Sequence, residues 1–297
     1  MSAFLSSVHG IDYALSSWLL GLIVFYFLIV TAGGIAAQDL LADFPKRLRV
    51  LSILTFISSA VWMLLSAEDM TETWAPTELW NAMAMTSFGH LWCTRLVVLF
   101  ILILLGARLS RSRAGSLALV ALGLAIPLLS VLSGHAGSQT DHLILRISTD
   151  WIHALAVGVW SGGLWMLYVW LGQRLRETGF NPNLSHLVVT RFSHFAMAST
   201  ALIIITGLLT AWLNGVPLLS PWTSLYGRLI LLKILFFGAA MLAAAVNQFI
   251  HIGNWRTENE LECVTYVRRE VRLEFVLLIV VFAVVGFLTR TGLPGEM

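Results

Sequence analysis

The sequence has 297 residues, of which 58% are hydrophobic and only 11% are charged, and its mean hydropathy is +0.84. A water-soluble core of this length does not require so much apolar surface, so we expect lipid to surround most of the chain. The net charge of +2 is too small to indicate a nucleic-acid partner. Residues 1–12 contain no basic segment ahead of the first apolar stretch, so we expect no cleaved signal peptide.

Apolar stretches of membrane-spanning length recur along the chain. The hydrocarbon core of a bilayer is about 30 Å thick and requires roughly 20 apolar residues of helix. The sequence offers about eight such stretches, at residues 14–36, 48–66, 91–108, 115–133, 147–171, 194–213, 226–249 and 273–290. We therefore predict an all-α, polytopic membrane protein with about eight transmembrane helices.

Basic residues gather in alternate loops between these stretches and so indicate the orientation. The first, third, fifth and seventh loops carry Lys46, Arg47, Arg49, Arg108, Arg111, Arg113, Arg174, Arg176, Arg191, Arg256, Arg268, Arg269 and Arg272. The second loop, residues 67–89, is instead acidic, with Glu68, Asp69, Glu72 and Glu78. The positive-inside rule then places the basic loops in the cytoplasm, and both termini and the even-numbered loops on the outer side of the membrane.

Two local signals predict helix starts outside the spans. Pro76 is followed by Thr77, which favours a short helix over 77–85 on the outer surface. Thr257 with Glu260 three residues later resembles a capping box, so we expect the last helix to begin well before the membrane.

A weak internal repeat divides the chain into two halves. The spacing of Phe88, Gly89, His90, Leu91 and Arg95 matches that of Tyr226, Gly227, Arg228, Leu229 and Lys233, and Trp18 with Gly21 matches Trp160 with Gly163. Because each half has an even number of spans, we predict two parallel four-helix repeats, residues 1–140 and 141–297. Chance matching among leucine-rich helices is the alternative. We expect Arg95 and Lys233 to reach the headgroups or to pair with a carboxylate.

The fifth span carries the most informative polar residues. Asp150 and His153 are three residues apart and share a helix face, which Trp160 continues. An ionisable pair inside a membrane is costly and is a functional hypothesis by default. The alternative is a carboxylate that only orients a structural histidine.

Other histidines are predicted at the same membrane level. His9 lies ahead of the first span, His90 opens the third, and His135 ends the fourth. Imidazoles from several helices, with carboxylate or sulfur donors, form the ligand set expected for copper, with zinc or haem iron as alternatives. We find no Gly-rich phosphate loop and no nucleophile elbow, so we expect neither an ATP-driven pump nor an enzyme.

An ordered set of short motifs resembles the CopD family of bacterial copper-resistance membrane proteins. The motifs are Ser133-Gly134-His135-Ala136, Asp150 and His153 leading into Val159-Trp160-Ser161-Gly162-Gly163-Leu164, Arg191-Phe192-Ser193, Thr206-Gly207, and Tyr226-Gly227-Arg228-Leu229 followed by Lys233 and Asn247. The resemblance spans essentially the whole chain. It implies about eight spans, copper movement across the inner membrane, and a periplasmic copper-binding partner of the CopC type.

The resemblance also implies metal roles for His135, Asp150 and His153, whereas His90 and His9 are candidates from topology alone. We therefore expect a periplasmic-side copper site that contributes to copper homeostasis or resistance. Two alternatives remain. One is a transmembrane oxidoreductase with haem between His90 and His153, because proteins related to this family are similar to a haem-dependent protoporphyrinogen oxidase group. The other is a membrane anchor or receptor whose histidines are structural.

Overall fold

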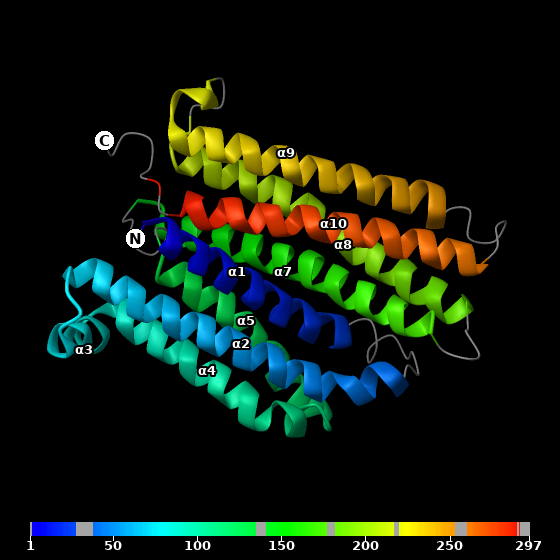
Figure 1. The fold of residues 1–297 in the computed structure, drawn as a ribbon, viewed down its shortest axis with the longest axis horizontal. Coiled ribbons are helices and arrows are strands. Elements are labelled where there is room, and N and C mark those ends of the chain that lie inside the picture. The colour runs from blue at the N-terminus through cyan, green and yellow to red at the C-terminus, as the bar shows by residue number, and fades with distance from the viewer. Residues whose placement is uncertain are drawn as a thin grey trace.

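The computed structural model describes residues 2–27, 38–134, 141–176, 182–216, 220–252, 260–289 and 291. Within these ranges, eight helices are long and apolar enough to cross a membrane, which confirms the prediction of an all-α polytopic protein. In chain order the helices are α1 (Ser2–Val24), α2 (Gln38–Thr71), α3 (Pro76–Met85), α4 (Ser87–Leu109), α5 (Arg113–Leu132), α7 (Leu143–Arg174), α8 (Pro182–Leu213), the short 3-10 turn η2 (Pro221–Thr223), α9 (Leu225–Val246), the π-helical segment η3 (Asn247–Ile252) and α10 (Glu260–Leu288). Figure 1 shows them as a bundle of nearly parallel rods, with α3 at one end.

Both predicted helix starts outside the spans agree with the structure. The short outer helix is α3, which begins at Pro76 and ends at Met85. Helix α10 begins at Glu260, well ahead of the expected span 273–290. Thr257, the other half of the predicted capping box, lies outside the described residues.

The predicted start of the first span was wrong. Helix α1 begins at Ser2 instead of near residue 14, so His9 and Asp12 lie inside the helix and not ahead of it. Asp12 interrupts the apolar run and therefore looked like a boundary. The folded bundle accommodates this carboxylate because Arg95 of α4 donates to it at 2.8 Å and both side chains are buried.

Helices α1 and α7 form the centre of the bundle and contact each other along their length. Their closest approach is at Gly21 and Gly162, where a Cβ atom on either glycine would come within 2.7 Å of the other's Cα. Small residues at such a crossing let two membrane helices pack backbone to backbone. The start of α1 also meets the end of α10, because Gly10 and Gly286 lie in contact. The two terminal helices therefore begin and end at the same side of the bundle, the predicted periplasmic end.

The remaining helices differ between the two predicted halves. Helix α2 packs against α4, and α4 against α5, in the first half. In the second half α7 packs against α8 and α9 against α10, but α8 and α9 make almost no direct contact. Helices α4 and α9 also begin alike, since Thr86 accepts from the backbone N–H of Gly89 and Ser224 from that of Gly227. The division into domains 1–140 and 141–297 stays a prediction.

A buried polar network fills the outer part of the first half. Asp12 accepts hydrogen bonds from Ser58 at 2.9 Å and Ser59 at 2.6 Å, both on α2. Arg95 donates to Asp12 and, at 2.6 Å, to Ser16 on α1, and it also donates to Ser130 on α5. The carboxylate pairing expected for Arg95 is thus confirmed.

Candidate metal site

In the second half, polar side chains lie at the gap between α8 and α9, where these two helices separate from each other. Asp150 and His153 project from α7 toward this gap, one turn apart, as the helical spacing predicted. Thr206 and Thr210 face them from α8, and Lys233 faces them from α9. Three helices thus contribute side chains to one place.

His153 is held in a defined orientation by α8. Its Nδ1 lies 2.9 Å from the hydroxyl oxygen of Thr206. That hydroxyl donates its own proton to the backbone carbonyl of Leu202 at 2.5 Å, so it can only accept from the imidazole. The network therefore assigns the proton of a neutral His153 to Nδ1 and leaves a lone pair on Nε2. An imidazole whose inner nitrogen is fixed in this way is prepared to bind a cation through the outer one.

A lysine ammonium occupies the place that such a cation would take. Lys233 Nζ lies 3.5 Å from His153 Nε2. Asp150 also acts electrostatically on Lys233, and its carboxylate accepts from Thr210 at 2.7 Å. The site therefore combines an imidazole lone pair, a carboxylate and a resident positive charge.

The outer rim of the gap is braced by a second set of hydrogen bonds. Arg146 at the start of α7 donates to the Asn214 side-chain oxygen at 2.9 Å and to the Leu213 carbonyl at 2.6 Å. Asn214 in turn donates to the Tyr226 hydroxyl at 3.1 Å, which links the end of α8 to the start of α9. The two helices are therefore tied together at the rim although they part below it.

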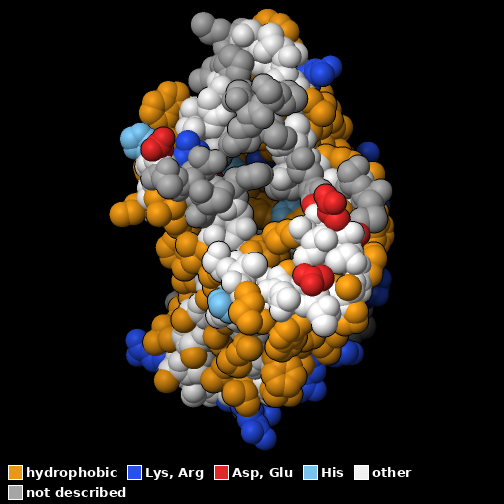
Figure 2. All heavy atoms as spheres, turned by 90° about the vertical axis from the view of Figure 1, so that its left-hand side faces the viewer, with side chains coloured by type: hydrophobic (Ala, Val, Ile, Leu, Met, Phe, Trp, Pro, Cys, Tyr) orange, Lys and Arg blue, Asp and Glu red, His pale blue; other side chains and the backbone are white. Residues whose placement is uncertain are grey.

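The predicted periplasmic end of the molecule is hollowed near its centre. In Figure 2, which looks onto this end, histidine side chains lie among the atoms around the hollow, and most of the visible acidic side chains lie on one side of it. The exposed acidic residues of the second loop are Asp69, Glu72 and Glu78. This face therefore offers cations a negatively charged approach.

The structure does not gather all the histidines that the sequence suggested. His135 lies outside the described residues. His90 is exposed and donates from Nε2 to the Ala84 carbonyl of α3 at 2.7 Å, and the ring of His9 packs on Trp62 with centroids 4.1 Å apart. In the described part of the chain, no group of three His, Cys, Asp or Glu side chains lies close enough to hold a metal ion. Asp150 with His153 is the pair that remains together, on one helix.

Sequence reasoning missed the partners of this pair. Thr206 was noted only as part of a motif, and Lys233 only as the counterpart of Arg95. Nothing in the spacing indicates that Lys233 meets His153, because 80 residues separate them. The repeat itself was the usable signal, since it placed Lys233 at the same depth as Arg95 and hence near the carboxylate of the second half.

Two family models match the chain. Residues 2–144 match the model described as copper resistance protein D-like, N-terminal domain, and residues 186–288 match copper resistance protein D. The chain belongs to the copper resistance protein D family. It is therefore a multi-pass membrane protein related to copper resistance, as the motifs suggested, and an inner-membrane location is consistent with both observations.

Asp150 and His153 fall between the two matched ranges, whereas Thr206, Thr210 and Lys233 lie within the copper resistance protein D match. Among curated proteins and among solved structures, none is significantly similar to this member of the family.

Proposed function

We propose that this protein receives copper on its periplasmic side at His153 and Asp150 and moves it inward through the gap between α8 and α9. The observation that carries the proposal is the Nε2 atom of His153, which lies 3.5 Å from the ammonium of Lys233. A cation already sits against a donor that is suited to copper. His135, which the family resemblance associates with the same role, is proposed as a further ligand.

Lys233 gives this site a means of releasing its cargo. An ammonium and a copper ion cannot share the Nε2 lone pair, so copper binding requires Lys233 to withdraw toward Asp150 or the rim. Lys233 returns when the ion leaves and stabilises the empty site. Such competition keeps the bound ion from being trapped, which transport requires.

The acidic outer loop supports a role for a periplasmic donor. Asp69, Glu72 and Glu78 are exposed at the predicted periplasmic end, where they attract cations or a basic patch on a copper-carrying protein. We therefore retain a CopC-type protein as the proposed partner. Its test is copper transfer from such a protein to this one, which should slow when these carboxylates are replaced by amides.

His9 and His90 are left outside the core of the proposed site because each is engaged elsewhere, on Trp62 and on Ala84. The haem alternative gains no support from the same arrangement. His90 contacts α3, whereas His153 contacts α8 and α9, and α4 does not pack against α7. Two axial ligands would need to face each other across one cofactor.

Replacing His153 with alanine should abolish copper uptake. The variant loses the only described imidazole in the gap, so we expect uptake into proteoliposomes to fall at least about tenfold. The measurement is copper accumulated in vesicles that contain purified protein. His194→Ala is the matched control, because His194 is an exposed histidine on α8 away from the site. Equal uptake by the two variants would refute the proposed role of His153.

Replacing Lys233 with leucine should tighten copper binding. The substitution removes a positive charge 3.5 Å from the proposed ligand, and a like charge at that range costs on the order of 4 kcal/mol in a medium of intermediate polarity. We expect the dissociation constant, measured by competition with a chromophoric chelator, to fall at least about tenfold. Lys233→Arg keeps the charge and should bind as the native protein does. Weaker binding in Lys233→Leu would show that the lysine is not a competitor.

A further inference from the structure

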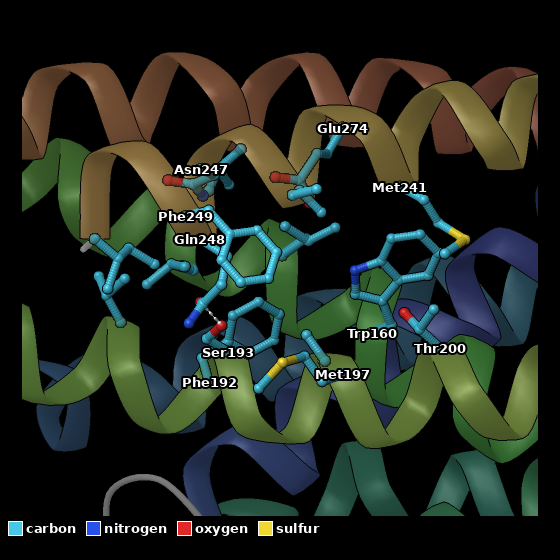
Figure 3. Close-up of a pocket in the computed structure, with 18 of the residues that line it drawn as sticks. Trp160, Phe192, Ser193, Met197, Thr200, Met241, Asn247, Gln248, Phe249 and Glu274 are labelled. Carbon is cyan, nitrogen blue, oxygen red and sulfur yellow. Dashed lines mark hydrogen bonds between the residues drawn. The ribbon is translucent and has the colours of Figure 1, made fainter.

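A cavity of about 320 Å³ lies in the same gap, deeper than the His153 site. Its walls come from α7, α8, α9, η3 and α10, and Figure 3 shows it between α8 and α9. Trp160 is one of its α7 residues, seven positions along the helix from His153. At 1.5 Å per residue, that places the cavity roughly 10 Å further along α7 toward the predicted cytoplasmic side. The gap thus contains the polar His153 site and, further along α7, this mostly apolar cavity.

Most of the lining is apolar, but its inner part has polar groups that are not fully paired. Glu274 of α10 is 2% exposed and Asn247 at the start of η3 is 7% exposed. Asn247 hydrogen-bonds the Glu274 carboxyl, yet Glu274 Oε1 and Asn247 Oδ1 have no hydrogen-bond partner. Asn247 Oδ1 is an acceptor, and so is Glu274 Oε1 when the carboxyl is ionised, and buried acceptors are almost always satisfied in native proteins. A proton on Glu274, another hydrogen-bond donor or a cation would satisfy these two oxygen atoms.

The charges around the cavity favour a cation. No basic residue lies among the described residues that line it. The charged side chain that acts on Glu274 is Glu270, one turn earlier on α10, which is also acidic. An acyl chain from the bilayer could fill the apolar part but would leave both oxygen atoms without a partner.

Soft donors line the same space. Met197 reaches it from α8 and Met241 from α9, on the two sides of the gap in Figure 3. Thioethers select copper(I) among biological cations, and a carboxylate adds the charge that neutralises it. The backbone contributes too, since the π-helical turn of η3 brings Asn247 and Gln248 into the lining. Turns of this kind occur frequently at functional sites.

A hydrogen bond between α8 and η3 lies among the residues that line the cavity. The Ser193 hydroxyl of α8 donates to the side-chain oxygen of Gln248, and Figure 3 marks this bond across the gap. Phe192, Ser193 and Asn247 had been singled out in the sequence as motif residues without an assigned role, and all three line this cavity.

We infer that this cavity is a second cation site, at which copper(I) that has left His153 is held by Glu274, Asn247 and the methionine thioethers before release. The nature of the ion rests on the proposed function. The site itself rests on the two unpartnered acceptor atoms, the acidic surroundings and the soft donors.

The test is to count and characterise copper(I) bound to the purified full-length protein in detergent. We expect Glu274→Gln to bind one copper ion fewer per chain than the native protein, whereas Glu262→Gln, a change at an exposed carboxylate on the same helix, binds the native number. The X-ray absorption spectrum of the native protein should contain sulfur neighbours of copper. Met197→Leu with Met241→Leu should lose them, and Met166→Leu, at a core methionine away from the cavity, should keep them.

The outcomes separate this inference from the proposed function. If the native protein binds copper and His153→Ala binds less, but Glu274→Gln and the double methionine variant match the native protein in copper number and sulfur signal, the inner site is refuted and the outer one stands. If His153→Ala binds the native number while Glu274→Gln binds less, the outer site is refuted and the inner one stands. A native protein that binds no copper overturns both.

Discussion

Replacing Asp12 with alanine is expected to destabilise the folded protein by about 3–5 kcal/mol, because the Arg95 guanidinium then stays buried without its counter-charge. Arg95 is 1% exposed, and Asp12 is the carboxylate to which it donates. Ser16 and Ser130 would still accept from the guanidinium, but neutral hydroxyls do not compensate a full charge. The measurement is unfolding of the purified protein in mixed micelles, followed by far-ultraviolet circular dichroism.

A second ion pair in the same chain supplies the control. Asp43 and Arg47 are also an aspartate and an arginine, 3.0 Å apart on α2, but the Asp43 side chain is 46% exposed. Asp43→Ala should therefore cost no more than about 1 kcal/mol. Adding Arg95→Leu to Asp12→Ala should recover part of the lost stability, since it removes the uncompensated charge. Similar losses for Asp12→Ala and Asp43→Ala would contradict the importance of burial.

Replacing Gly162 with alanine should be nearly as damaging. The added Cβ would lie 2.7 Å from the Cα of Gly21 and 2.8 Å from the carbonyl oxygen of Ser17. These are backbone atoms, so no change of rotamer can relieve the overlap and α1 must move away from α7. Because this crossing is the centre of the bundle, we expect a loss of about 3 kcal/mol in the free energy of unfolding.

The same substitution elsewhere tests that explanation. Gly238 lies on α9, where an added Cβ would meet nothing within 4 Å. Gly238→Ala should leave stability unchanged or raise it by up to about 1 kcal/mol, because alanine is the better helix former. If both alanine variants were equally stable, close approach of the helices at Gly162 would not limit stability.

Hydropathy predicted the number of spans because lipid imposes a simple requirement on length and polarity. It failed at α1, where Asp12 was taken as a boundary. A hydropathy average over neighbouring residues includes the charge of Asp12 but carries no information on Arg95. The contact between these two side chains depends on how α1 and α4 pack. The short helix α3 was predictable because Pro76 acts locally.

The candidate site was predictable only in the part that lies on one helix. Asp150 and His153 share a face by periodicity, and this held. The contact of His153 with Lys233 depends on how far α8 and α9 separate, which no local pattern encodes. Glu274 was missed although it lies within the expected last span, where a lone ionisable residue is itself a signal.

The Asp12–Arg95 pair also bears on how the protein enters the membrane during synthesis. The two residues are 83 positions apart, with α1, α2 and α3 made before α4. Helix α1 therefore emerges from the ribosome carrying a carboxylate whose partner on α4 has not yet been translated. We expect α1 to remain beside the insertion machinery, shielded from acyl chains, until α4 arrives and the two helices leave together.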